Sequence, residues 1–301
     1  EDLISNVILR SGGLFGIDEI EKAMSTNNEL VSNEVKMKEY SKHLRIYNDR
    51  GKSIYTTKSQ IATENRIISA INKGANKFAA IYSKEEINNF SSQQKSIDKD
   101  LNKLLFGDIV DDKGSNLYST LNDSQKHTVD FILQSKDQFL GIQGYAGVGK
   151  TYTIKALNEK LAAKGYEILG FAPTNSAAVT LFEESGIKTN TLQSFLLKYN
   201  GYANDRNGNV EVLKTIKNSF KNKIILVDEA SLISNTQMKE LVVIAEKFGT
   251  RVIMQGDIKQ LGSVEAGSPF ELLIKNKFIE YDILKNIQRQ RDQELKNTVL
   301  D

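Results

Sequence analysis

The stretch Gly144–Thr151, GYAGVGKT, decides the fold of this chain. It follows the short apolar run Phe139–Ile142 and precedes a segment in which Ile154, Leu157 and Leu161 recur at helical spacing. The stretch matches the pattern G-x-x-x-x-G-K-[ST], in which glycines between a strand and a helix let backbone N–H groups surround a polyphosphate. A strand, a phosphate-binding loop and a helix are therefore expected in that order. A glycine-rich turn that contains Lys-Thr by chance is the alternative.

Two side chains at the end of this stretch carry charge and metal chemistry. Lys150 supplies a positive charge for the β- and γ-phosphates, and Thr151 offers a hydroxyl to Mg²⁺. The helix that begins here directs the positive end of its dipole toward the same anion. The stretch therefore predicts a site for a nucleoside triphosphate with Mg²⁺. The residues that we expect to bind this cofactor are Gly144, Gly147, Val148, Gly149, Lys150, Thr151 and Tyr152.

The composition excludes several classes of protein. With 40 Lys and Arg against 38 Asp and Glu the net charge is +2, so any nucleic-acid surface must be local. The chain has no cysteine and two histidines, which excludes disulfides and cysteine nucleophiles and argues against a zinc site. We expect a reducing, cytoplasmic location. No apolar run approaches the roughly twenty residues of a membrane span, so no membrane segment is expected. The ends at Glu1 and Asp301 suggest a piece of a longer protein.

Residues 1–74 predict a small winged-helix-like module. Apolar residues at helical spacing predict two helices within 17–44, and 46–57 has the pattern of a hairpin. A further helix is expected over about 58–73, with Gly74 as its stop signal. Lysines and arginines make this module locally basic, but glutamates are interspersed. Contact with DNA and a solvated charged surface both remain open.

A polar segment over 75–118 is rich in Ser, Asn, Gln, Lys and Asp and predicts a partly helical linker. An α/β domain is then expected over 119–284, because further strand patterns alternate with helical patterns there. The strand patterns lie at 167–173, 224–228 and 251–257. This alternation predicts a mostly parallel sheet with helices on both faces.

Two adjacent carboxylates follow the buried-strand run Ile224–Val227. Because side chains alternate along a strand, those of Asp228 and Glu229 can diverge at its end. Asp228 can then hold Mg²⁺ while Glu229 reaches the attacking water. Just beyond the next strand, Gln260 is placed to sense the γ-phosphate or to position water. Asp257 belongs either to this site or to an ordinary turn.

Seven motifs in order resemble the RecD-like, 5′-to-3′ branch of superfamily 1 helicases, and most of all the helicase part of conjugative relaxases. Those proteins join a DNA-nicking domain to a motor. The motifs are Gln125, GYAGVGKT, FAPTNSAA (Phe171–Ala178), TLQSFL (Thr191–Leu196), VDEAS (Val227–Ser231), GDIKQLGSVEAG (Gly256–Gly267) and the pair Arg289-Gln290. Ile54–Ile68 is similar to the segment that precedes the motor in that family. The resemblance implies a first RecA-like (P-loop) motor domain over 119–284 and the start of a second over 285–301.

The resemblance also implies roles for single residues. Gln125 would read the adenine of ATP, although the residues around it equally predict an ordinary capped helix in which Asn122 or one of its two successors is the cap. Gln260 would couple the γ-phosphate to DNA. Arg289 would act as an arginine finger, with Arg291 as a near neighbour.

Motif matches that imply contact with single-stranded DNA are Pro173, Thr174, Asn175, Thr191 and Phe195. Small polar groups in loops can hold phosphates, and an aromatic ring can stack on a base. For Phe195 a core position in its helix is the alternative. Gln193 stands where many relatives carry histidine, and Gly262 where many carry proline.

The expected function is that of the N-terminal part of an ATP-dependent 5′-to-3′ DNA helicase that moves along single-stranded DNA in conjugative DNA transfer. Other relaxosome proteins are candidate partners. The expected catalytic residues are Glu229, Lys150, Gln260 and Arg289, and the expected metal ligands are Thr151 and Asp228. Because a translocating motor needs two domains that close on ATP, this stretch alone is expected to be poorly active. The alternatives are a DNA-binding or loading module without unwinding activity, and a small-molecule kinase or regulatory P-loop protein.

Overall fold

The computed structural model describes residues 30–32, 55–89, 117–145, 147–205, 209–260 and 267–285. The chain divides into two compact units, Glu1–Arg66 and Ile67–Asp301, and each is considered by itself. Within the described segments no helix combines the length and the apolar character that crossing a membrane requires.

The described part of the first unit is a short antiparallel strand pair followed by a helix. Strand β1 (Leu30–Ser32) pairs with β2 (Tyr55–Thr57), and α4 (Lys58–Lys73) follows and crosses the boundary between the units. The Thr57 hydroxyl accepts the Gln60 N–H at 3.1 Å and so caps the first turn. The helix expected over 58–73 is confirmed. The described partner of 55–57 is Leu30–Ser32, which the sequence did not predict as a strand; the first arm of the expected hairpin and the two helices expected before it lie outside the described residues.

The second unit is built on a six-stranded sheet in which every neighbouring pair is parallel. In spatial order its strands are β5 (Thr189–Thr191), β4 (Glu167–Ala172), β6 (Lys223–Val227), β7 (Arg251–Gly256), β3 (Phe139–Gly144) and β8 (Glu280–Leu284). The expected α/β class and the four central strands are confirmed. The two edge strands, β5 and β8, were not expected from the sequence.

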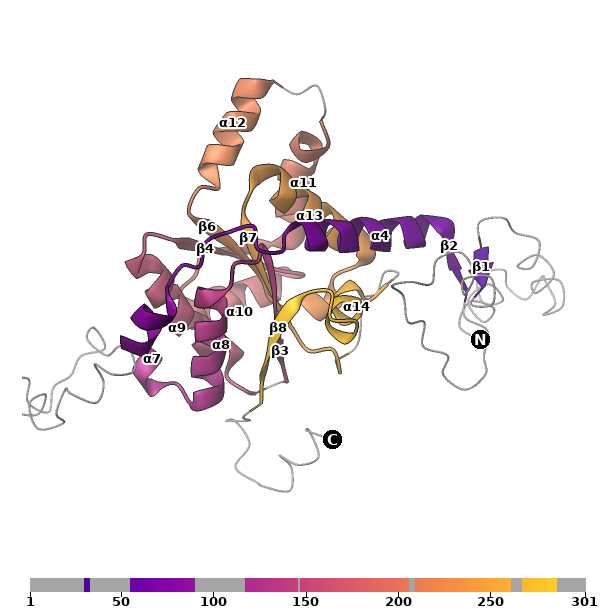
Figure 1. Ribbon diagram of the computed structural model, residues 1–301. Helices are drawn as coiled ribbons and strands as arrows, with labels where there is room; N and C mark the ends of the chain where they lie inside the picture. Colours follow the sequence, from indigo (N-terminus) through magenta and orange to yellow (C-terminus); the bar gives the residue numbers. More distant parts are fainter. Residues whose placement is uncertain are drawn as a thin grey trace, which may run out of the picture. The chain divides into compact units, whose positions relative to one another are not determined.

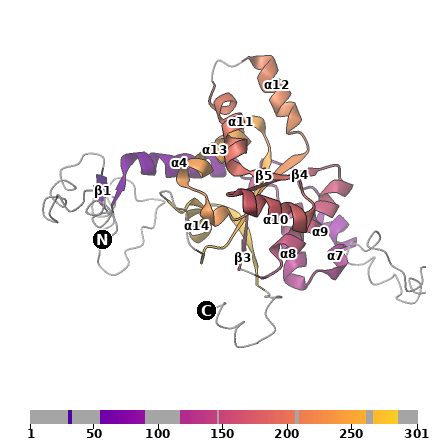
Figure 2. The same cartoon turned by 180° about the vertical axis from the view of Figure 1, so that it is seen from behind.

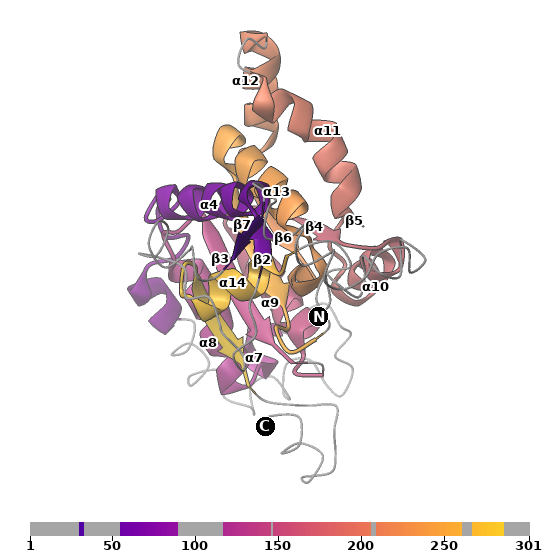
Figure 3. The ribbon, with the colours of Figure 1, turned by 90° about the vertical axis from the view of Figure 1, so that its right-hand side faces the viewer.

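Both faces of this sheet are buried, because successive residues of β6 enter two different cores. Ile225 and Val227 pack in one cluster and Ile224 and Leu226 in the other. The helices on the Ile224 face are α7 (Leu117–Thr120), α8 (Asp123–Gln134), α9 (Lys150–Ala163) and α10 (Asn175–Ser185). Those on the other face are α11 (Leu192–Asn204), α12 (Val210–Ser219), α13 (Asn235–Phe248) and α14 (Pro269–Lys275). Figures 1 and 2 show α8 and α9 on one side of the sheet and α14 on the other, and Figure 3 shows α12 beyond the end of α11.

Residues 75–89 pack onto the second unit and are not a free linker. The backbone N–H groups of Phe78 and Ile81 donate to carbonyls near the C-terminal end of α8, at 2.8 and 2.9 Å. The Tyr82 hydroxyl donates to a carbonyl of α9 at 2.8 Å. Ile81, Tyr82 and Ile87 are buried in the same core as α8 and α9. The polar composition of the longer segment hid these three apolar anchors.

Parallel pairing brings the C-terminal ends of β3, β4, β6 and β7 to one edge of the sheet, which we call the carboxyl edge. The opposite edge, where these strands begin, is the amino edge. Both are distinct from the two lateral edges of the sheet, which are formed by β5 and β8. Each of the segments singled out from the sequence follows a strand at the carboxyl edge: 144–151 follows β3, 173–175 follows β4, 228–229 follows β6 and 257–260 follows β7. Crevices at this edge are where open α/β sheets bind their ligands.

Candidate nucleotide-binding site

The loop between β3 and α9 has the backbone shape of a phosphate cradle. Gly147 and Gly149 have φ values of 80° and 81°, a left-handed conformation that favours glycine. Helix α9 begins at Lys150, and no side chain caps its N-terminus. By contrast, α8, α10, α11 and α13 each begin with a side chain that accepts a backbone N–H. The first N–H groups of α9 therefore remain to bind an anion.

Lys150 lies folded back over this loop. Its Nζ donates to the Gly144 carbonyl at 2.7 Å, and a Cβ at position 144 would lie 3.1 Å from the lysine side chain. Burial lowers the pKa of Lys150, while the charges of Asp228, Asp257 and Glu229 oppose that shift. The lysine therefore lies over the phosphate loop, within the electrostatic influence of three carboxylates.

The two carboxylates after β6 line one pocket but differ in their contacts and backbone. Asp228 Oδ1 accepts the Glu229 N–H at 2.9 Å and the Gln255 Nε2 at 2.9 Å. Glu229 has a φ of 51°, a strained conformation for a residue with a side chain, and such strain gathers at functional sites. Burial raises the pKa of Glu229, Asp228 raises it further, and Lys150 lowers it. A carboxylate with a raised pKa is better suited to accept a proton from water.

A pocket of about 260 Å³ opens beside these carboxylates. Its lining residues come from the end of the phosphate loop, from α10 and from the end of β6: Thr151, Thr174, Ser176, Ala177, Thr180, Leu181, Glu184, Asp228 and Glu229. A hydroxyl and carboxylates around one cavity are the oxygen ligands that Mg²⁺ prefers, so the residues present fit this ion. The structure thus brings the expected metal ligands together with Thr174, one of the residues expected to contact DNA.

The turn after β7 is fixed to the strand that leads into the phosphate loop. Gln143, near the end of β3, donates to Asp257 Oδ1 at 3.2 Å and accepts the Ile258 N–H at 3.1 Å. Asp257 Oδ1 also accepts the Lys259 N–H at 3.0 Å, so Asp257 organises the turn. Gln260 follows in this turn with its side chain exposed, at the same edge as Lys150.

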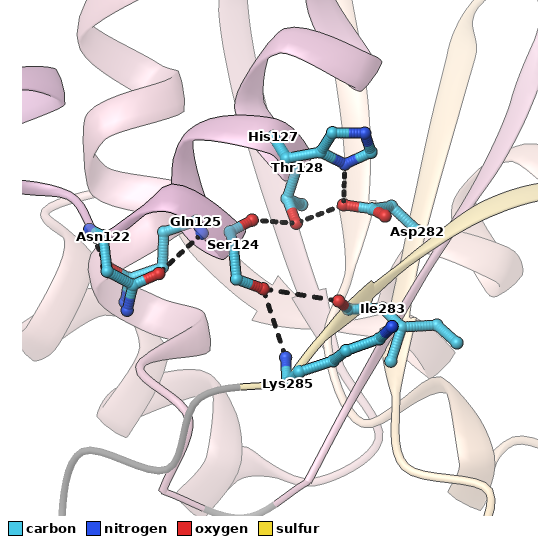
Figure 4. Close-up of polar contacts among 8 residues, drawn as sticks. All are labelled: Asn122, Ser124, Gln125, His127, Thr128, Asp282, Ile283 and Lys285. Carbon is cyan, nitrogen blue, oxygen red and sulfur yellow. Dashed lines mark hydrogen bonds and ion pairs between the residues drawn. The ribbon is translucent and has the colours of Figure 1, made fainter.

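Gln125 faces the phosphate loop from α8 and completes a helix cap. Asn122 Oδ1 accepts the Gln125 N–H at 2.9 Å, and Gln125 Oε1 accepts the Asn122 N–H at 3.1 Å (Figure 4). The capped helix expected from the sequence is therefore confirmed, with Asn122 as the cap. Gln125 Nε2 lies 3.4 Å from the Val148 carbonyl. A Cβ added to Gly149 would lie 2.5 Å from the same Nε2 atom.

Helix α8 is also joined to β8 by a serine near its first turn. Ser124 Oγ donates to the Ile283 carbonyl at 3.4 Å and accepts the Lys285 N–H at 3.2 Å (Figure 4). These two backbone groups belong to alternate residues of an edge strand and point to the same side. One hydroxyl thus supplies a donor and an acceptor that a further strand would otherwise provide.

A second contact between α8 and β8 lies one helical turn further on. Thr128 Oγ1 donates to Asp282 Oδ2 at 2.6 Å, and His127 Nδ1 lies 3.1 Å from the same oxygen (Figure 4). The helix that carries Gln125 is therefore held to the last described strand at two places.

The residues expected to contact DNA are divided by the structure. Thr174 caps α10 by accepting the Ala177 N–H at 3.1 Å, and Asn175 is exposed beside it. Pro173 is partly exposed just before them. Thr191 caps α11, its hydroxyl 2.7 Å from the Ser194 hydroxyl.

Phe195 is a correction to the expected DNA contacts. Its side chain is 4% exposed, and its ring centroid lies 4.5 Å from that of Phe171 and 5.1 Å from that of Tyr199. A ring enclosed by other rings cannot stack on a base. Phe195 is a core residue of α11, because its position on the helix faces the sheet.

Two further residues of the expected site are Tyr152 and Arg289. Tyr152 is 39% exposed at the start of α9, and its hydroxyl lies 2.6 Å from that of Thr120. Arg289 lies outside the described residues. Reasoning from the sequence missed Gln143 and Gln255, which support Asp257 and Asp228. One sequence pattern marks both residues: each of two apolar strands ends in a glutamine followed by a glycine, in Ile142-Gln143-Gly144 and Met254-Gln255-Gly256.

An uncapped helix behind a glycine loop, with a lysine and two carboxylates at the carboxyl edge of a parallel sheet, defines a P-loop nucleotide-binding domain. Residues 120–301, more than half of the chain, match the AAA domain family, and the chain belongs to that family.

Three curated relatives connect this domain with conjugation proteins and helicases. A probable conjugal transfer protein TraA of Sinorhizobium fredii is 33% identical over 184 residues, which are 61% of this chain and 15% of the relative. A multifunctional conjugation protein TraI of Escherichia coli is 32% identical over 58% of this chain and 10% of the relative. An ATP-dependent RecD2 DNA helicase of Deinococcus radiodurans is 33% identical over 42% of this chain and 16% of the relative. The expected resemblance is confirmed, and the chain spans only a small part of each relative.

Proposed function

We propose that this chain is the first motor domain of an ATP-dependent DNA helicase that moves 5′-to-3′ along single-stranded DNA during conjugative transfer in the cytoplasm. The observation that carries the proposal is the single pocket shared by Thr151, Asp228, Glu229 and Thr174. Expected ATP ligands and an expected DNA-binding segment line the same cavity. A change in nucleotide state can therefore reach α10 directly.

The side chains suggest a division of labour during hydrolysis. The uncapped start of α9 and Lys150 would bind the phosphates, and Thr151 with Asp228 would hold Mg²⁺. Bound Mg²⁺ would neutralise charge that develops on the phosphates. Glu229 would accept the proton of the attacking water, a role that its raised pKa favours. Gln260 and Arg289 would respond to the γ-phosphate, as the resemblance implies.

Gln125 is proposed to recognise adenine while keeping the phosphate loop in place. Its Oε1 is occupied by the helix cap, but among the described residues its Nε2 makes one long contact, at 3.4 Å, with the Val148 carbonyl. An amide nitrogen has two protons, so one donor remains for a base. Gln125 is buried beside the loop, so its amide has little freedom to turn away from a base bound there.

The test is DNA-stimulated ATP hydrolysis by the full-length protein carrying Lys150→Ala. Loss of a phosphate-binding charge is expected to reduce the rate by about 100-fold or more. Lys155→Ala is the matched control, because Lys155 lies on the same helix with its side chain exposed. If DNA-stimulated hydrolysis persists in Lys150→Ala, the proposed function as an ATP-dependent DNA helicase is contradicted. Equal rates with and without single-stranded DNA in the unaltered protein would favour a kinase or regulatory protein instead.

A second candidate function is a DNA-binding or loading module that does not unwind. The chain spans only a small part of its relatives, and unwinding needs two motor domains that close on ATP. A strand-displacement assay on the 301-residue chain tests the second candidate. Binding of single-stranded DNA without displacement is expected, and efficient unwinding by this chain alone would refute the second candidate.

A further inference from the structure

Gln255 is a polar residue in the interior of an apolar strand. It is the next-to-last residue of β7, is 0% exposed, and pairs in register with Ile142 of β3. Its Nε2 donates to Asp228 Oδ1 at 2.9 Å. A glutamine side chain is seldom wholly buried without a reason that outweighs the loss of its hydration.

The orientation of this amide is fixed by its partner. An ionised carboxylate accepts hydrogen bonds and cannot donate them, so Nε2 and not Oε1 must face Asp228. Asp228 Oδ1 also accepts the Glu229 N–H, so this oxygen is satisfied by two donors. Asp228 Oδ2 makes no hydrogen bond with the residues that the structure describes. The two donors therefore divide the carboxylate into a held oxygen and a free oxygen.

The other end of the Gln255 amide is left without a partner. Gln255 Oε1 and the nearby hydroxyl of Ser231 are buried, and neither has a hydrogen-bond partner within the described segments. At Gly256, β7 lies close to the backbone of Ser231, since a Cβ added to Gly256 would lie 2.9 Å from the Ser231 backbone nitrogen. Buried polar atoms are nearly always paired, so unpaired ones next to a metal-binding carboxylate indicate a role other than stability.

We infer that Gln255 is a positioning residue for Asp228, which it turns so that Oδ2 faces a hydrated divalent cation bound with the nucleotide. The inference rests on the proposed function and deepens it. Residues that hold a metal-ligating carboxylate through a hydrogen bond affect metal affinity although they do not touch the metal. Its unpaired Oε1 is a suitable acceptor for water, which a bound Mg²⁺ brings to its site.

A second buried glutamine of the same sheet provides a control. Gln138 is also 0% exposed, but it lies at the amino edge, where its Nε2 donates to the Ala245 carbonyl at 2.7 Å and to the Thr250 carbonyl at 2.9 Å. Both Nε2 bonds go to backbone carbonyls, and its Oε1 accepts a hydrogen bond from Lys77 Nζ at 3.0 Å, so the whole amide is paired. Replacing Gln138 by Met is expected to lower stability, whereas replacing Gln255 by Met removes an unpaired buried acceptor and is expected to leave the melting temperature unchanged or higher.

The experiment measures binding of a fluorescent ADP analogue to the 301-residue chain at increasing free Mg²⁺, and again in EDTA. In the unaltered chain Mg²⁺ is expected to tighten binding. Gln255→Met is expected to raise the free Mg²⁺ needed for half of this effect by about 10- to 100-fold, while affinity in EDTA stays the same. Gln138→Met is expected to keep the Mg²⁺ response of the unaltered chain.

The outcomes distinguish failure of the proposed function from failure of the positioning role of Gln255. No nucleotide binding by the unaltered chain contradicts the proposed function itself. Normal binding together with an unchanged Mg²⁺ response in Gln255→Met overturns the positioning role alone. A Met variant that fails to fold also counts against it, because the amide would then serve stability. Gln255→His retains an N–H donor of similar reach and is expected to restore most of the response; a His variant as weak as the Met variant would contradict the role of the donor.

Discussion

The hydrogen bonding of buried polar groups differs between the two edges of the parallel sheet. At the amino edge, Gln138 donates to two backbone carbonyls, and the buried Arg251 donates to the carbonyls of Asp137, Ser135 and Ala79 at 3.1, 3.0 and 3.3 Å. Each of these bonds ties a strand to a neighbouring segment. The amino edge is therefore a place where polar groups hold the fold together.

At the carboxyl edge Gln143 is paired with Asp257 and with the Ile258 N–H, but other buried or half-buried groups are strained or unpaired. Glu229 has a left-handed backbone, Gln255 and Ser231 have buried atoms without partners in the described segments, and the pKa of Glu229 is raised by burial. These features cost stability, and such costs gather where a protein binds and reacts. Unpaired and strained groups thus gather at the end of the strands where the expected site lies, whereas Gln138 and Arg251 are paired at the other end.

The largest expected effect tests the chemical side of this comparison. Glu229→Gln keeps the shape of the side chain but removes the proposed base, so we expect kcat for ATP to fall by about 10²- to 10⁴-fold. Nucleotide affinity and melting temperature should hold, because the lost charge lay beside Asp228. Glu183→Gln, at an exposed position of α10, is the control. A variant that loses stability but hydrolyses ATP normally per folded molecule would show that Glu229 serves the fold and not the reaction.

The next effect tests the stability side. Arg251→Met leaves three backbone carbonyls without their donor, and we expect the free energy of unfolding to fall by about 2–4 kcal/mol. Thermal and urea unfolding measure this change, with the exposed Lys221→Met as control. Nucleotide affinity of the folded protein should be unchanged. Loss of affinity without loss of stability would show that the two edges are not separate.

A third prediction concerns pH. Burial raises the pKa of Glu229, so the base form is lost on acidification at a higher pH than for an ordinary glutamate. Burial lowers the pKa of Lys150, so its charge is lost on alkalinisation at a lower pH than for an ordinary lysine. The profile of kcat/KM should be a narrowed bell that falls about tenfold per pH unit beyond each limit. Glu229→Gln should lack the acidic limb, and a profile with that limb intact would assign it to another group.

The smallest effect concerns Ser124, which joins α8 to β8. Ser124→Ala removes a donor and an acceptor from the end of an edge strand, and we expect a loss of about 1 kcal/mol in stability. Hydrogen exchange at the Lys285 amide should accelerate in the folded protein. Ser119→Ala, on the short helix α7, serves for comparison. Unchanged exchange at Lys285 would contradict the role of the serine.

The sequence predicted those parts of the fold that leave a local pattern. Apolar runs marked the four central strands, and GYAGVGKT placed the phosphate loop. The strand Thr189–Thr191 escaped notice because it is short and polar, and β8 because its first three residues are Glu280, Tyr281 and Asp282, an ordinary surface pattern. Edge strands are stabilised by one neighbour, which a local pattern does not reveal.

The site was predictable to the extent that each residue has its role within its own motif. Lys150, Asp228 and Glu229 lie at the same edge of the sheet, since parallel strands bring their ends together. Gln255 could not be assigned, because its partner Asp228 lies on another strand. Phe195 shows the converse error, since an aromatic residue in a motif gives no sign of which side of its helix it occupies.

The pairing of β8 has a mechanical consequence. A force applied at Lys285 in the direction of β8 would load its hydrogen bonds with β3 in shear, from the pair Leu140 and Glu280 to the pair Gly144 and Leu284. Bonds loaded in shear resist together, whereas bonds at the end of a hairpin open one after another. Ser124 adds a further attachment where the load enters. Tension applied at Lys285 is thus borne by the strand that ends in the phosphate loop.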